Sequence, residues 1–239
     1  MKMTAGDLVK QLQGALAADL RAVVLYGSAT TGDYISKWSD TNVLVVVERL
    51  DMKTLRALAK PSAAWVKAGN HQAPLLFTPE SLRDSADVFP IEMLDIQDAH
   101  QVLLGDDPFP GIKIGMANLR VQVEHELRGK LGQLRSDGVL AIDDPRRLVN
   151  LMVASVSKFL ILFRAALRLY EREVPSKKLD ALQALTRHVK FDTEPFAQIH
   201  TLKEGRRKPG YVDAGQLFEK YLQGIEQVVK AVDQVQSQA

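Results

Sequence analysis

Cysteine is absent from the 239 residues, which excludes disulfide bonds and zinc–thiolate sites and fits a reducing cytoplasm. The formal net charge of +2 is too small to indicate nucleic-acid binding by itself. The N-terminal residues lack the apolar core and the small-residue cleavage site of a signal peptide. The longest apolar stretch, residues 148–170, is interrupted by Lys158, Arg164 and Arg168, which predicts a buried helix rather than a membrane span. We therefore expect a soluble, cytoplasmic protein without a membrane partner.

The first part of the chain alternates short apolar runs with segments of helical spacing. Gly, Pro, Asn and Asp bound the apolar runs, as they usually bound strands. The expected strands are residues 22–26, 43–47, 74–77 and 91–96, and the expected helices are residues 8–20, 52–68 and 79–86. Strands separated by helices predict an α/β domain whose sheet is at least partly parallel.

The second part of the chain is purely helical in its spacing. Residues 105–111, a cluster of Gly, Asp and Pro, are the best candidate for a domain boundary. Expected helices follow at residues 118–135, 145–172, 176–189 and 215–235. We predict an α/β domain with a mixed sheet over residues 1–110 and an all-α helical bundle of about four helices over residues 111–239.

Residues 22–48 combine two strands with residue types that bind phosphate and metal ions. Gly27-Ser28 follows the first strand, where a glycine lets a ligand approach the backbone and a serine offers a hydroxyl beside free amides. Asp40 and Asn42 stand at the head of the second strand. Side chains at i and i+2 of a strand share a face, so an acidic pair here would hold Mg²⁺. A Gly-Ser pair after a strand is, by itself, usually a turn without a binding function. In the absence of the Gly-Ser pair, Asp40 would be interpreted as a residue that caps the start of the second strand.

This arrangement resembles the signature of the nucleotidyltransferase superfamily, which has the DNA polymerase β-like fold and in which Gly-Ser is followed by Asp-x-Asp. The resemblance implies that Gly27 and Ser28 bind nucleotide phosphates. It also implies that Asp40 is catalytic and binds the metal, Mg²⁺ or Mn²⁺. Asn42 departs from the pattern, because an amide oxygen carries no charge and cannot bridge two metal ions as a carboxylate does.

A third acidic ligand is expected from the apolar segment at residues 89–96, which contains Glu92 and Asp95. On the expected strand these residues face opposite sides, so only one reaches the site. The resemblance favours Glu92, as metal ligand and base; the alternative is an exposed strand edge.

The resemblance extends to small bacterial proteins in which a nucleotidyltransferase domain precedes a helical domain. It implies a nucleoside triphosphate substrate, ATP first among them, and an acceptor that is a small molecule, an RNA or a protein. Two functions stay open: transfer of a nucleoside monophosphate to an acceptor hydroxyl, or a degenerate fold that binds a nucleotide or a protein without turnover. The sequence is compatible with a homo-oligomer.

Arg120, Glu124 and Arg128 recur at spacings of four residues along one expected helix. The two arginines are candidates for contact with nucleotide phosphates. The alternative is an exposed ladder of ion pairs, in which each pair stabilises the helix by a few tenths of a kcal/mol.

Overall fold

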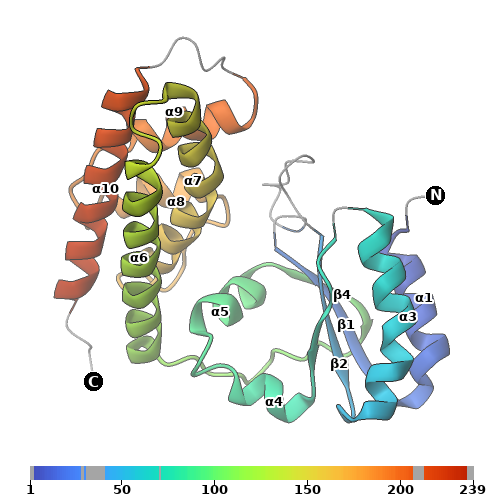
Figure 1. Ribbon diagram of the computed structural model, residues 1–239. Helices are drawn as coiled ribbons and strands as arrows, with labels where there is room; N and C mark the ends of the chain where they lie inside the picture. The colour runs from blue at the N-terminus through green and yellow to red at the C-terminus, as the bar shows by residue number, and fades with distance from the viewer. Residues whose placement is uncertain (1–2, 28–29, 31–40, 70, 207–212, 236–239) are drawn as a thin grey trace. The chain divides into compact units, whose positions relative to one another are not determined.

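The computed structural model describes residues 3–27, 30, 41–69, 71–206 and 213–235. The chain forms two compact units, Met1–Gly115 and Met116–Ala239. The first combines a sheet with helices, and the regular elements among the described residues of the second are all helices (Figure 1). These are the α/β domain and the helical domain expected from the sequence.

The described residues of the first unit form a four-stranded mixed sheet in the order β3-β2-β1-β4. The strands are β1 (Leu20–Tyr26), β2 (Asn42–Val47), β3 (Leu75–Phe77) and β4 (His100–Gly105). β1 pairs antiparallel with β2 and β4, whereas β2 and β3 are parallel. β1 and β2 are central and mostly buried, which explains their nearly continuous apolar sequences.

Helices cover both faces of this sheet (Figure 1). On one face, α1 (Ala5–Leu16) and α3 (Met52–Ala68) pack on the alternate strand residues Val23, Val43, Val45 and Val47. On the other, α4 (Pro79–Asp84) and α5 (Pro90–Asp98) pack on Ala22, Val24, Leu44 and Val46. The period-2 alternation of a strand therefore divides the valine-rich sequences between two cores.

The strand expected at residues 91–96 is wrong, because this segment is helix α5. Pro90 opens the helix at its first turn, and Met93 and Ile96, three residues apart, both pack on the sheet. The strand of this region is β4, which begins at His100. Glu92 and Asp95 therefore lie on neighbouring helical positions rather than on opposite faces of a strand.

The helical unit contains α6 (Met116–Val139), α7 (Pro145–Leu167), α8 (Lys178–Leu185), α9 (Glu194–Lys203) and α10 (Ala214–Gln234). α9 is absent from the sequence-based expectations. Aromatic rings form the centre of the unit: Phe159 and Phe196 both pack against Tyr221. α7 alone among the described helices is long and apolar enough to span a membrane, and more than half of its most apolar segment is buried in the unit.

Candidate functional site

A row of three side chains crosses one end of the sheet. Tyr26, the last residue of β1, pairs with Asn42 on β2 and with His100 on β4. Directly paired residues of adjacent strands project to the same face. Tyr26 packs with the core under α4 and α5, so this row belongs to the α5 side of the sheet.

Gly27 turns the chain immediately beyond this row. Its φ of +83° lies in the left-handed region, and a Cβ atom at this position would lie 3.0 Å from Asn42 Nδ2. The Gly27 carbonyl accepts hydrogen bonds from Thr30 N at 3.0 Å and from Thr30 Oγ1 at 2.8 Å. The same hydroxyl lies 2.9 Å from the carbonyl oxygen of Ala99, between α5 and β4. Thr30 thereby links the end of β1 to the segment before β4, and Asn42 lies close to Gly27.

Glu92 contributes negative charge at this end of the sheet. It lies exposed in the first turn of α5. Burial, and secondarily the charge of Glu92, raise the pKa of Tyr26 to about 12. The helix thus brings the carboxylate of Glu92 into electrostatic range of a residue that pairs directly with Asn42. The element assigned to Glu92 from sequence is incorrect, and its role as a third acid stays a prediction.

His71 and Trp65 lie beside the start of β2. His71 forms a parallel bridge with Thr41, the residue before Asn42. The His71 ring stacks on the buried Trp65 ring with centroids 3.7 Å apart and an angle of 8° between the planes. This stack supports the chain where the predicted metal ligands stand. Sequence reasoning missed Tyr26 and His71, because strand pairing rather than spacing brings them to the site. It also missed Thr30, whose hydrogen bonds to Gly27 and Ala99 place it there.

Two of the predicted residues, Ser28 and Asp40, lie outside the described residues. Within the described ranges no group of three or more His, Asp or Glu side chains is placed to hold a metal ion. Asn42 and Glu92 offer the hard oxygen atoms that Mg²⁺ prefers, but with only one charge between them. A fit to Mg²⁺ therefore requires Asp40, two residues before Asn42 in the sequence, as an additional ligand.

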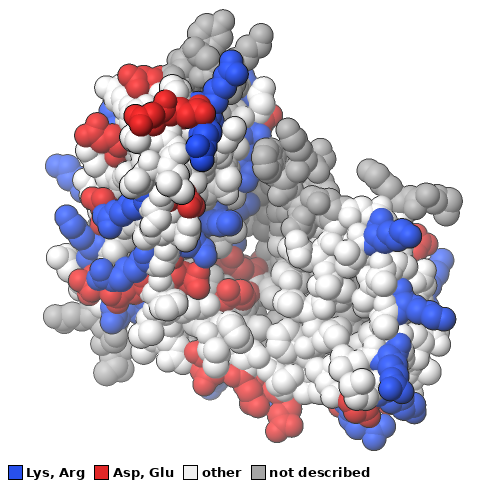
Figure 2. Space-filling model, viewed as in Figure 1, with Lys and Arg blue, Asp and Glu red and all other residues white. Residues whose placement is uncertain are grey.

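Arg120 and Arg128 belong to the helical unit, on α6. Arg120 Nη1 lies 2.8 Å from Glu124 Oε2, and Arg128 Nε lies 2.8 Å from Glu124 Oε1. Arg128 also contacts Asp233 of α10 at 3.0 Å. On the face drawn in Figure 2, basic and acidic side chains intermingle over this unit. These contacts form the ion-pair ladder expected as the alternative, and nucleotide contact by the two arginines stays a prediction.

Comparison with known proteins relates the chain to solved structures but to no family model. No protein-family model and no curated protein matches the sequence. Among solved structures, the chain is similar to the spectinomycin adenyltransferase AAD(9) from Enterococcus faecialis, determined with ATP and spectinomycin. The match has a TM-score of 0.57 and 12% sequence identity, and it covers 95% of this chain and 98% of that chain. Both units of the chain therefore follow the fold of a nucleotidyltransferase with a C-terminal helical domain.

Proposed function

We propose that the protein transfers a nucleoside monophosphate from a nucleoside triphosphate, ATP in the first instance, to an acceptor hydroxyl. The observation that carries the proposal is the close approach of Asn42 to Gly27 at one end of β1 and β2, where a Cβ atom on Gly27 would lie 3.0 Å from Asn42 Nδ2. A phosphate-binding turn beside a metal-ligand position is what phosphoryl and nucleotidyl transfer require. The similar structure holds ATP and a small molecule, which favours a small-molecule acceptor over RNA or protein.

The proposed roles follow from the residue types. Gly27 and Ser28 bind the phosphates, and Arg120 and Arg128 are further candidates for nucleotide contact. Asp40, Asn42 and Glu92 hold Mg²⁺ or Mn²⁺, with Asp40 and Glu92 as the catalytic acids. The metal, when bound, supplies neutralisation of the charge that develops on the phosphate oxygens. A cytoplasmic location and a homo-oligomeric state belong to the same proposal.

Asn42 weakens such a site. The amide removes one full negative charge from the metal ligands, and electrostatic stabilisation of this kind is worth several kcal/mol. Each ~1.4 kcal/mol corresponds to about a tenfold change in rate. We therefore propose a slow enzyme.

The second candidate is a degenerate relative that binds a nucleotide or a protein without turnover. The observation that favours it is the same uncharged residue, Asn42, at a position half-buried against Gly27.

The test is titration of ATP, CTP, GTP and UTP with Mg²⁺ or Mn²⁺ into wild-type protein and into Asn42→Asp. Release of pyrophosphate, the leaving group when water or an added small-molecule alcohol accepts the nucleotidyl group, is measured in parallel. Asn118→Asp, an exposed residue of α6, is the matched control for an added carboxylate. If the protein is a slow enzyme, it binds at least one nucleotide in the presence of metal. The Asn42→Asp variant then releases pyrophosphate at least tenfold faster than the wild-type protein. Metal-independent binding without pyrophosphate release from either protein would favour the degenerate relative. Absence of any nucleotide binding in both proteins would refute the nucleotide site.

A further inference from the structure

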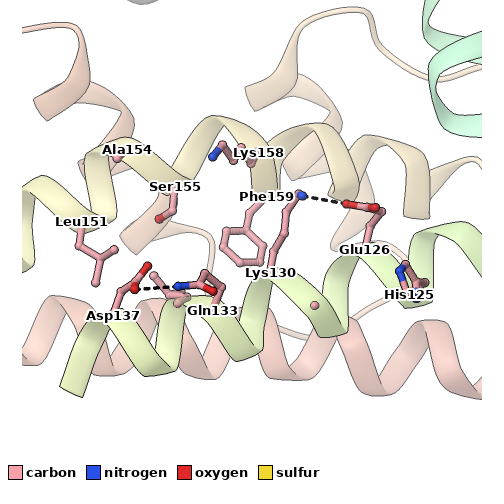
Figure 3. Close-up of a pocket in the computed structure, with 12 residues that line it drawn as sticks. His125, Glu126, Lys130, Gln133, Asp137, Leu151, Ala154, Ser155, Lys158 and Phe159 are labelled. Atoms are coloured by element: carbon pink, nitrogen blue, oxygen red, sulfur yellow. Dashed lines mark hydrogen bonds and ion pairs between the residues drawn. The ribbon is translucent and has the colours of Figure 1, made fainter. Parts of the chain in front are cut away.

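The helical unit contains a pocket of about 380 Å³ between α6 and α7 (Figure 3). This volume lies within the range of small-molecule sites, about 300–1,000 Å³. Its apolar wall is formed by Leu134, Leu151 and Phe159, and its polar lining includes Lys130, Ser155 and Lys158. All of these residues belong to one unit, so the pocket does not depend on the proposed nucleotidyl transfer.

Gly129 keeps part of this pocket open. A Cβ atom at Gly129 would meet no atom within 4 Å, although the residue lines the pocket from the middle of α6. Glycine is a poor helix former, so its presence inside a helix normally has a packing reason. Such a reason exists at Gly138 and Gly224, where a Cβ atom would lie 2.6 Å from Phe218 and 2.7 Å from Phe196, respectively. At Gly129 the missing side chain leaves space instead.

The charged side chains around the pocket differ in whether they have an ion-pair or hydrogen-bond partner. Lys130 pairs with Glu126 at 2.8 Å, and Asp137 accepts a hydrogen bond from Gln133 at 2.8 Å (Figure 3). Lys158, which enters from α7, has neither an ion pair nor a hydrogen-bond partner among the described side chains. Lys158 is therefore the one ammonium group of the pocket without an acceptor among the described residues, since Lys130 is paired with Glu126.

Two further lysines lie near Lys158 in the helical unit. Lys203, at the end of α9, donates a hydrogen bond to Ser157 Oγ at 2.8 Å. Burial lowers the pKa of Lys203, and repulsion from Lys178 and Lys158 lowers it further. Lys158 and Lys178 thus both lie within electrostatic range of Lys203. The carboxylates of the pocket, Glu126 and Asp137, are engaged by Lys130 and Gln133, so the charge near Lys158 favours an anion.

We propose that this pocket binds a small amphipathic anion, whose apolar body lies on Leu134, Leu151 and Phe159 and whose acidic group binds Lys158. The apolar wall supplies most of the affinity, because burial of apolar surface dominates small-molecule binding. Lys158 is exposed, so its ion pair adds a smaller and salt-sensitive part and selects the sign of the ligand.

Two fluorescent probes that differ by one acidic group test the proposal. 8-Anilinonaphthalene-1-sulfonate is an aromatic anion, and N-phenyl-1-naphthylamine is the same molecule without the sulfonate. Wild-type protein is expected to bind the anion at one saturable site. Lys158→Gln is expected to weaken the anion roughly three- to fivefold at low salt and to leave the neutral probe unchanged.

Gly129→Leu and Gly132→Leu form a matched pair of variants. Both glycines lie inside α6 with no atom within 4 Å of a Cβ, but only Gly129 lines the pocket. Gly129→Leu should weaken both probes at least tenfold, and Gly132→Leu should leave them within about twofold of wild type. Leucine is the better helix former, so circular dichroism should show both variants folded. Ala154→Leu fills the pocket from α7 if Gly129→Leu does not fold.

Equal effects of the two leucine variants on the probes would overturn the assignment of the site to this pocket. An unchanged affinity of Lys158→Gln for the sulfonate would overturn the choice of an anion.

Discussion

Gly27→Ala tests the contact on which the candidate site rests. The substitution has two separate costs in the structure. Alanine at a φ of +83° costs about 1–2 kcal/mol, because an L-residue is disfavoured in the left-handed region. The new methyl group would also lie 3.0 Å from Asn42 Nδ2, and displacement of this side chain adds about 1 kcal/mol. We expect a total loss of about 2–3 kcal/mol in the free energy of unfolding.

Two further variants separate these costs. Gly111→Ala is the matched control, because Gly111 has a φ of +86° and no atom within 4 Å of its Cβ position. Gly111→Ala should lose only the ~1–2 kcal/mol that an L-residue costs in the left-handed region. Asn42→Ala removes the amide, so Gly27→Ala made in that background should also cost no more than Gly111→Ala. The expected coupling between positions 27 and 42 is therefore about 1 kcal/mol, which a double-mutant cycle resolves.

Urea unfolding followed by tryptophan fluorescence measures this cycle in the correct unit, since both tryptophans, Trp38 and Trp65, belong to residues 1–115. Additivity of Gly27→Ala and Asn42→Ala within about 0.3 kcal/mol would refute the contact. So would a cost of Gly27→Ala no larger than that of Gly111→Ala.

Three other predictions address charge and packing. Glu92→Gln should lower the pKa of Tyr26 below about 12, although burial should still keep it above the ordinary value. The pKa is measured from the phenolate absorbance that is lost in Tyr26→Phe. An unchanged pKa would show that Glu92 does not lie near Tyr26. The lowered pKa of Lys203 means that the folded protein releases this proton before the unfolded chain does. Stability should therefore rise with pH from the lowered pKa toward the ordinary 10.5, and Lys203→Met should flatten this rise in thermal unfolding curves. Gly105→Ala should lower the free energy of unfolding in urea by more than about 3 kcal/mol. Gly105 has a φ of +77°, and a Cβ atom there would collide with the backbone carbonyl oxygen of Arg21. A loss under about 1 kcal/mol would contradict the geometry of β4.

The central strands and the edge strand β3 could be predicted from sequence, and the other edge strand, β4, could not. β1 and β2 are nearly continuous apolar runs because both of their faces are buried. β4 is only half-buried, so its sequence carries no comparable signal. The short apolar segment before it fits a strand or a buried helix equally well by periodicity, and Pro90 at the first turn decides for the helix.

The residues of the candidate site that lie close together in the sequence could be predicted. Gly27 and Asn42 stand at strand ends and could be recognised there. Glu92 was named from the resemblance, although on a strand rather than on α5. Tyr26 and His71 reach the same region through strand register, which a single sequence does not encode locally. The lining of the pocket between α6 and α7 depends likewise on the packing of two helices.

The central claim is tested most directly by calorimetric titration of ATP, with and without Mn²⁺, into wild-type protein and Asp40→Ala. Asp87→Ala, an exposed residue of the same unit, is the matched control. We predict that wild-type protein and Asp87→Ala bind ATP in a Mn²⁺-dependent manner, and that Asp40→Ala binds it at least tenfold more weakly. Equal affinities in all three proteins, unaffected by Mn²⁺, would contradict the metal site and with it the proposed nucleotidyl transfer.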